Sequence, residues 1–118
     1  MKVLGIESTA HTLGIGIVKE EKIGVSRKWE CLANQKAMFE PEEGGIHPRK
    51  AAEHHYKHAL ELLNNAEQES DIKFEDLDGI AFSQGPGIPQ CLDVGAVIAR
   101  SLAQKHDLPL IGVNHCLA

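Results

Sequence analysis

The sequence has few cysteines, no long apolar run and no excess of basic residues, and each absence excludes a class of protein. Its three cysteines, at positions 31, 91 and 116, are widely spaced and form no C-x-x-C pair. A disulfide framework is therefore not expected, and a reducing, cytosolic compartment fits best. No apolar run approaches the ~20 residues that span a bilayer, and Glu7 ends the first apolar stretch before a signal peptide could form. We expect a cytoplasmic protein with no membrane partner.

Charge and length set further limits. The 118 residues carry 12 lysines and arginines against 17 aspartates and glutamates, for a net charge of -5. A stand-alone nucleic-acid-binding domain usually presents a basic face, so this class is not favoured. A chain of this length can build one core but has little room for a second lobe.

The hydrophobic pattern predicts five strands and two helices. The strands are expected at 3–6, 13–18, 23–32, 78–83 and 108–113 and the helices at about 48–69 and 89–105, with a polar turn at 8–12, a charged hairpin tip at 19–22 and a loop at 33–47. Pro48 suits the first turn of a helix. The order β-β-β-α-β-α-β predicts a mixed sheet with helices on its faces. This is the α/β topology of an actin-like ATPase (ribonuclease-H-like) lobe that lacks its last helix.

The expected burial follows from the same pattern. The first helix should bury one apolar stripe, made of Ala52, Tyr56, Ala59, Leu60, Leu63 and Ala66. The centre of the second helix, residues 94–99, is apolar nearly all round and should be deeply packed. The fifth strand is also expected to be buried.

The turn at 8–12 is rich in hydroxyl groups and has two interpretations. In an actin-like lobe, a turn between the first two strands can direct backbone N–H groups and hydroxyls at phosphate oxygens. Ser8, Thr9, His11 and Thr12 are therefore candidate residues on the phosphate side of a nucleotide site. The alternative is a polar hairpin turn with no ligand.

The segment Gly85-Pro86-Gly87 lies between a predicted strand and a predicted helix. Glycines there would let a ligand approach the backbone, and the N-terminus of a helix favours anions. The alternative is a tight turn that only connects the two elements. It is not a phosphate-binding Walker loop, because no G-x-x-x-x-G-K-[ST] occurs in the chain.

Histidines offer candidate metal ligands at two places. His54 and His58 are four residues apart on the first predicted helix, a spacing that can bind a metal, but the sequence places no third ligand beside them, so a solvated or partner-facing helix surface is favoured. Asn114 and His115 follow the last strand, at the sheet edge where α/β sites gather. A structural role is the alternative for His115.

A two-metal nuclease would need carboxylates on the first strand, the first helix and the fourth strand. Glu7 and either Glu53 or Glu61 could supply the first two, but the fourth strand ends in Ser83-Gln84. The nuclease interpretation is therefore weak.

Five ordered stretches resemble one family, the universal tRNA threonylcarbamoyl transferases, which supply the catalytic subunit of the KEOPS complex in archaea and eukaryotes and are called TsaD in bacteria. The resemblance is to the archaeal and eukaryotic branch. The stretches are Gly5-Ile6-Glu7-Ser8-Thr9-Ala10-His11-Thr12, Gly44-Gly45-Ile46-His47-Pro48-Arg49, Ala51-Ala52-Glu53-His54-His55, Phe82-Ser83-Gln84-Gly85-Pro86-Gly87 and Ile111-Gly112-Val113-Asn114-His115-Cys116-Leu117-Ala118.

The resemblance implies a two-lobed, actin-like enzyme of which residues 1–118 form the N-terminal lobe, truncated before its last helix. Such enzymes transfer threonylcarbamoyl from its adenylate to N6 of the adenosine next to the tRNA anticodon. They bind an adenine nucleotide and a divalent metal, usually iron. His115 matches the first histidine of the family's His-x-x-x-His metal motif, and the second would follow Ala118. We expect the lobe alone to be inactive and to hold no metal tightly, with the catalytic residues outside it.

One position departs from the family pattern. Asp93 stands where relatives usually carry a basic residue. A negative charge in the first turn of a helix is stabilised by the helix dipole but would repel an anion. The substitution puts a phosphate or tRNA contact there in doubt.

The resemblance also implies partners. The helices at about 48–69 and 89–105 are expected to pack against the small dimerising subunit of KEOPS, with the kinase subunit and tRNA joining in the complete complex. Their expected outer faces are polar and mixed, and carry His54, His58, Glu61, Asn65 and Gln104. Two alternatives stay open: a non-catalytic scaffolding or dimerising paralogue, and the lobe of an actin-like sugar or acetate kinase.

Overall fold

Five strands form one mixed sheet with two α-helices. The computed structural model describes residues 1–40 and 47–114. The elements in order are β1 (Lys2–Glu7), β2 (Thr12–Ile23), β3 (Ser26–Met38), α1 (Pro48–Ser70), the 3-10 helix η1 (Phe74–Asp76), β4 (Gly79–Gly85), α2 (Pro89–His106) and β5 (Leu110–Asn114). The sheet order is β3-β2-β1-β4-β5. β2 pairs antiparallel with β1 and β3, whereas β4 pairs parallel with β1 and β5. The predicted α/β topology is confirmed; η1 was not predicted.

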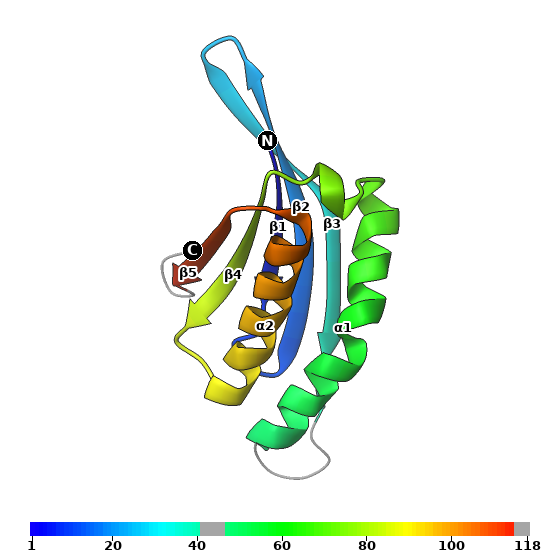
Figure 1. Cartoon of the computed structure of the whole chain (residues 1–118), viewed down its shortest axis with the longest axis vertical. Coiled ribbons are helices and arrows are strands. Elements are labelled where there is room, and N and C mark those ends of the chain that lie inside the picture. The colour runs from blue at the N-terminus through cyan, green and yellow to red at the C-terminus, as the bar shows by residue number, and fades with distance from the viewer. Residues whose placement is uncertain (41–46, 115–118) are drawn as a thin grey trace.

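Both α-helices lie on the same face of the sheet (Figure 1). Right-handed crossovers that advance in one direction along a sheet place their helices on one side, and here the chain advances from β3 through β4 to β5. The core fills the space between these helices and the sheet. Its strand residues alternate along the chain, because successive side chains point to opposite faces: Leu4, Ile6, Leu13, Ile15, Ile17, Ile80 and Phe82.

The opposite face of the sheet is covered by no element among residues 1–40 and 47–114. Its centre is built from glycines, since Gly5 pairs with Gly16 and Glu7 pairs with Gly14 across β1 and β2. A groove of about 700 Å³ follows this face, and a Cβ added at Gly5 would meet nothing within 4 Å. We call this surface the open face. Its groove is lined by Gly5, Ile6, Glu7, Thr12, Gly14, Ile15, Gly16, Asn34, Lys36, Met38, Ala81, Phe82, Ser83 and Val113.

The hairpin formed by β2 and β3 is longer than the sequence predicted. Residues 19–22, expected to be the tip, continue β2, and residues 33–38, expected to be loop, continue β3. Opposite charges pair across the strands, as in Glu21 with Lys28, so a charged run is compatible with a ladder here. The chain reverses at Gly24, whose φ is +64. The hairpin projects beyond the rest of the sheet (Figure 1).

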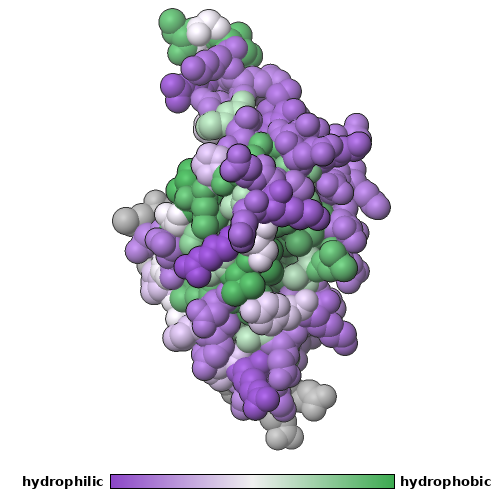
Figure 2. Space-filling view, in the orientation of Figure 1, coloured by the Kyte–Doolittle hydropathy of each residue, from purple (hydrophilic) through white to green (hydrophobic). Residues whose placement is uncertain are grey.

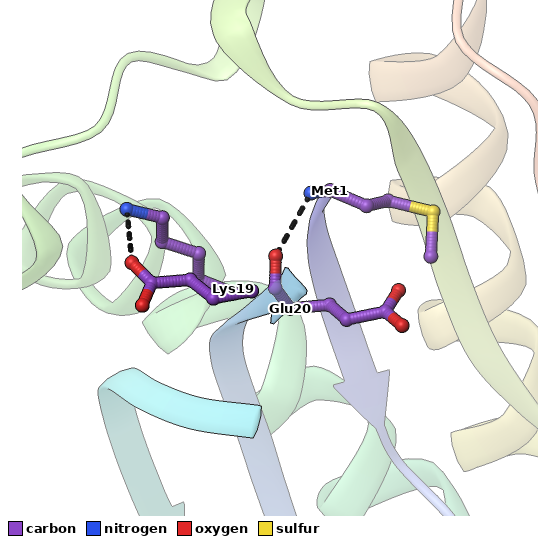
Figure 3. A network of polar contacts seen from close by, with 4 residues as sticks. Met1, Lys19 and Glu20 are labelled. Atoms are coloured by element: carbon purple, nitrogen blue, oxygen red, sulfur yellow. Dashed lines mark hydrogen bonds and ion pairs between the residues drawn. The ribbon is translucent and has the colours of Figure 1, made fainter. Parts of the chain in front are cut away.

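The start of β1 is held against β2 by backbone bonds (Figure 3). The amino group of Met1 donates to the carbonyl of Glu20 at 3.2 Å, and the Glu20 N–H donates to the Met1 carbonyl at 2.7 Å. Lys19 forms an ion pair with Glu21 at 2.9 Å. Because this ion pair is exposed, it stabilises the hairpin little, and the backbone ladder fixes the register.

The expected buried stripe of α1 is confirmed at Ala59 and Ala66, half-buried at Ala52 and Leu63, and wrong at Tyr56 and Leu60. The buried residues are Ala51, His55, Ala59, Leu62 and Ala66, whereas Tyr56 is 52% exposed and Leu60 is 69% exposed. The true stripe passes through a histidine. A pattern built on apolar residues alone therefore left out His55 and included two exposed residues of the neighbouring face.

Three expectations about α2 and β5 are also corrected. Val97 is 46% exposed, so α2 is not packed all round, and Ile111 is 53% exposed, so β5 is not a buried strand. β5 is the edge of the sheet, with the open face on one side. The first turn of α2 contains no acidic residue, because the helix begins at Pro89 and Asp93 lies in its second turn.

Within residues 1–40 and 47–114, no helix is both long enough and apolar enough to cross a membrane.

Candidate functional site

The turn between β1 and β2, residues 8–11, lies where polar segments from several elements meet. β1 and β4 are parallel, so both end at the same sheet edge, and binding sites of open α/β sheets gather at such edges. The turn follows the last residue of β1. The segment 86–88, which leads into α2, follows β4. Two stretches that sequence analysis singled out separately are thus neighbours.

Three successive carbonyl groups of the turn accept hydrogen bonds from three different elements. The carbonyl of Thr9 accepts from the N–H of Ile88 at 2.7 Å, and that of His11 accepts from the N–H of Phe39 at 2.7 Å. The carbonyl of Ala10 lies 2.7 Å from Nε2 of His55 on α1. The backbone of the turn is therefore held in one conformation by α1, by the chain after β3 and by the start of α2.

Glu7 closes the turn from within. Its carboxylate accepts a hydrogen bond from the N–H of Thr9 at 2.6 Å and a second from the hydroxyl of Thr9. The N–H of Ser8 donates to the hydroxyl of Ser83 on β4 at 3.2 Å. These bonds tie the turn to the ends of β1 and β4.

Glycines permit the close contact between the turn and α2. A Cβ added at Gly87 would lie 2.5 Å from the carbonyl oxygen of Thr9, and one added at Gly95 would lie 2.2 Å from the hydroxyl oxygen of Ser8. Real Cβ atoms do not approach this closely. Gly87 is thus required by packing within the protein, whether or not it also contacts a ligand. The N-cap residue of α2, Ile88, makes no side-chain capping bond, which leaves the helix start without a side-chain acceptor.

Histidines of α1 form the wall behind the turn. His55 is fully buried, and its Nδ1 lies 3.0 Å from Nδ1 of His54. The His54 ring packs against those of His58 and Phe39, with centroids 4.5 Å and 5.5 Å away. Burial lowers the pKa of His55 below its ordinary value, opposed by the bond to the Ala10 carbonyl. Burial, followed by the charges of His58 and His55, also lowers the pKa of His54.

The structure places the four predicted turn residues in different environments. Ser8 is fully buried and Thr9 nearly so, whereas His11 is exposed and Thr12 is half-buried at the open face. A phosphate role for these residues stays a prediction, and only His11 and Thr12 present side chains to solvent. His115, the predicted metal ligand, lies outside the described residues. The described part of the chain contains no cluster of three His, Cys, Asp or Glu positioned to hold a metal ion.

The carboxylates considered for a nuclease do not converge. Glu53 is exposed and pairs with Arg49, and Glu61 is exposed and lies near His58. Glu7 is engaged with the turn. The described residues therefore do not assemble the carboxylate set of a two-metal nuclease.

Sequence reasoning missed His55 and the structural role of Glu7. The spacing of His54 and His58 drew attention to the wrong pair. A signal was present, because Ala51, His55, Ala59, Leu62 and Ala66 recur at three- and four-residue spacing. A histidine within such a stripe has to find polar partners in the interior.

Comparison with known proteins identifies the family. The family model for tRNA N6-adenosine threonylcarbamoyltransferase matches residues 30–118. Relatives of that name from Ignicoccus hospitalis and Thermococcus sibiricus are 50% and 52% identical, each over 100% of this chain and 34% of the relative. A probable bifunctional tRNA threonylcarbamoyladenosine biosynthesis protein from Methanosarcina acetivorans is 48% identical over 98% of this chain and 20% of its own length. The chain thus spans about a third of the length of the first two relatives.

Solved structures show the same fold at low sequence identity. YeaZ from Pseudomonas aeruginosa superimposes with a TM-score of 0.70 at 13% identity, covering 97% of this chain and 45% of that one. RuvC from Thermus thermophilus superimposes with a TM-score of 0.59 at 18% identity, covering 97% of this chain and 62% of RuvC. These likenesses support the predicted actin-like, ribonuclease-H-like lobe. The family-model match over residues 30–118 shows that the chain belongs to the tRNA N6-adenosine threonylcarbamoyltransferase family.

Proposed function

We propose that this chain is the N-terminal lobe of a tRNA N6-adenosine threonylcarbamoyltransferase. The complete enzyme would transfer threonylcarbamoyl from its adenylate to N6 of the adenosine next to the anticodon. The observation that carries this proposal is the identity of 50–52% over the whole chain to transferases of that name. The location would be the cytoplasm, where the tRNA substrate is found.

The division into lobes has physical support in the open face. A sheet with a groove of about 700 Å³ along one face leaves apolar surface exposed to water, which is unfavourable in an isolated domain. The first relatives continue for about twice this length beyond the matched part, since the chain covers 34% of them. We propose that the segment that follows residue 118 packs on the open face and that a second lobe follows it.

The nucleotide would bind beside the turn at residues 8–11. The start of α2 lies against this turn through the Ile88–Thr9 bond, and N–H groups at the start of a helix attract phosphate. His11 and Thr12 would contact the nucleotide directly, with Ser8 and Thr9 shaping the turn from its buried side. Asp93 is exposed in the second turn of α2, one turn away from the free N–H groups.

A metal ion would be held by His115 together with residues of the remaining chain. A single imidazole does not hold a metal tightly, and the described residues contain no group of three His, Cys, Asp or Glu that could hold the ion. The lobe alone is therefore proposed to be inactive. When the metal is bound in the complete protein it would supply positive charge for the transferred group.

The outer face of the two helices is the proposed surface for the small dimerising subunit of KEOPS, with the kinase subunit and tRNA binding the complete assembly. Figure 2 shows hydrophobic residues over the middle of α1 and α2, bordered by hydrophilic ones. Tyr56, Leu60 and Val97 are 52%, 69% and 46% exposed. An exposed apolar centre with a polar rim is typical of protein interfaces. The surface is more apolar than the sequence pattern predicted.

A lobe exchange tests the proposal. The first third of the Thermococcus sibiricus relative is replaced by residues 1–118, and the chimera is produced in cells that lack their own transferase. Threonylcarbamoyladenosine is then measured in digested tRNA by mass spectrometry, with the unmodified relative as the control. We expect the chimera to restore the modified nucleoside. A chimera that accumulates folded, binds its partner subunit and leaves tRNA unmodified would contradict the proposal.

A further inference from the structure

We propose that His55 is a positioning residue that orients one peptide group of the nucleotide-binding turn, and that His54 holds His55 in the required tautomer. The inference rests on the proposed function, in which the turn at residues 8–11 contacts phosphate. Its own basis is a chain of polar contacts that runs from α1 into that turn.

The first step is the burial of His55. Its side chain is fully buried among small residues of the α1 stripe, at a position where an apolar side chain would avoid the cost of burying polar atoms. Both ring nitrogens have polar partners, Nε2 at the Ala10 carbonyl, 2.7 Å away, and Nδ1 at His54, 3.0 Å away. His55 is thus a polar connector rather than a space-filling residue.

The second step is the direction of the bonds. A carbonyl oxygen can only accept, so Nε2 of His55 carries the proton and donates it to Ala10. Neutral His55 then has a bare Nδ1, which accepts a hydrogen bond from Nδ1–H of His54. The chain of donors is therefore His54 to His55 to Ala10. The lowered pKa values of both rings agree with neutral imidazoles in this arrangement.

The third step is the effect on the turn. The peptide group is planar and trans, so the C=O of one residue and the N–H of the next point in opposite directions. By holding the Ala10 carbonyl toward α1, His55 turns the N–H of His11 away from α1. The carbonyls of Thr9 and His11 are held by backbone N–H groups. The Ala10 carbonyl alone of these three is held by a side chain.

The fourth step is the brace behind His55. The His54 ring lies against Phe39, with centroids 5.5 Å apart, and the N–H of Phe39 donates to the His11 carbonyl. His54 therefore contacts both His55 and Phe39, the two residues that hold the Ala10 and His11 carbonyls. The contacts form one unit that fixes the peptide groups on both sides of the His11 Cα.

Substitutions of different reach test this role in the complete protein. In His55→Gln, the amide nitrogen can occupy the position of Nε2 and donate to Ala10; in His55→Asn, the side chain is too short to reach. His55→Leu fills the volume without a donor. Gln68→Asn, on the same helix and exposed, is the matched control. The measurements are the dissociation constant for ATP by calorimetry and amide hydrogen exchange at residues 10–12.

We expect His55→Leu and His55→Asn to weaken ATP binding and to speed exchange at residues 10–12 by roughly tenfold, the effect of losing one buried hydrogen bond. His55→Gln should stay within about twofold of the wild type, and Gln68→Asn should match the wild type. If His55→Leu does not fold, the comparison of Gln with Asn remains decisive, because both are polar amides.

Two results would overturn the inference: equal effects of His55→Gln and His55→Asn on both measurements, or unchanged exchange at residues 10–12 in His55→Asn. Failure of the proposed function has a different signature. If the wild-type protein binds no ATP, the nucleotide site is wrong, and hydrogen exchange alone then decides whether His55 holds the turn.

Discussion

Gly95 of α2 lies so close to Ser8 that a Cβ at position 95 would be 2.2 Å from the Ser8 hydroxyl oxygen and 3.2 Å from its Cβ. Ser8 is fully buried in the turn after β1, so its side chain has little room to move. The absence of one methyl group on a helix thus permits the turn to pack against that helix.

Gly95→Ala is expected to destabilise the protein. Overpacking of a dense interior costs about 1–3 kcal/mol, which exceeds the roughly 1 kcal/mol that alanine gains over glycine in a helix. Urea denaturation of the complete protein measures the change in the free energy of unfolding. Ser8→Ala removes the closer of the two contacts, so the double variant should recover most of the loss. Additive effects of the two substitutions would show that the contact does not determine the need for glycine.

Stability is expected to fall as the pH drops below about 6.5, the ordinary histidine value. Burial lowers the pKa of His55 and of His54 in the folded protein. Between the folded and the ordinary pKa, the unfolded chain binds more protons, so protonation favours unfolding as the pH falls. Above that pH window, the contribution of these two histidines to the free energy of unfolding is constant.

The check is urea denaturation at pH 7.5, 6 and 5 for the wild type and for His55→Gln, which retains a donor to Ala10 but has no titrating ring. The variant should lose less stability between these pH values. An identical loss in both proteins would assign the acid sensitivity to other groups.

The topology could be predicted from the sequence, whereas several burial assignments could not. A short apolar stretch identified β1, alternation of apolar residues with glycine identified β2, and Pro48 marked the start of α1. The charged run at 19–22 was assigned to a turn because its cross-strand partners, such as Lys28 opposite Glu21, are known only once the strands are paired. His55 was left out of the expected buried stripe because a histidine carries no apolar signal.

The site was predictable in its location but not in its contacts. The turn at 8–12 and the segment 85–87 were both singled out from residue type. Their contact through the Ile88–Thr9 hydrogen bond depends on the parallel pairing of β1 with β4, which brings the two strand ends to one edge. The buried state of the Ser8 hydroxyl depends on α2, which is distant in the sequence.

Gly5→Val tests the proposal that further chain covers the open face. In the structure a Cβ at Gly5 meets nothing within 4 Å, so the 118-residue chain should tolerate valine, a residue suited to strands. In the complete protein, a segment packed on the open face would clash with the new side chain, and stability should fall by about 1–3 kcal/mol. Thermal unfolding of both chains provides the comparison. Equal tolerance in both would contradict close packing there.

Leu60→Asp tests the proposed surface for the small dimerising subunit. Leu60 is 69% exposed, so the change should alter the free energy of unfolding by less than about 0.5 kcal/mol. A charge at the apolar centre of an interface should weaken subunit binding at least tenfold, or about 1.4 kcal/mol. Val25→Asp is the control, because Val25 is fully exposed at the hairpin tip. Calorimetry measures the affinity of each variant for the subunit. Equal affinities for Leu60→Asp and Val25→Asp would show that Leu60 lies outside the interface.

The reaction itself is tested most directly with the purified complete protein, its partner subunits, threonylcarbamoyl adenylate and tRNA. Mass spectrometry of the digested tRNA should find threonylcarbamoyl on N6 of the adenosine next to the anticodon. A tRNA with guanosine at that position should remain unmodified. Unmodified adenosine in an assembly that binds both adenylate and tRNA, or modification of a different base, would contradict the assignment of this chain to a tRNA threonylcarbamoyltransferase.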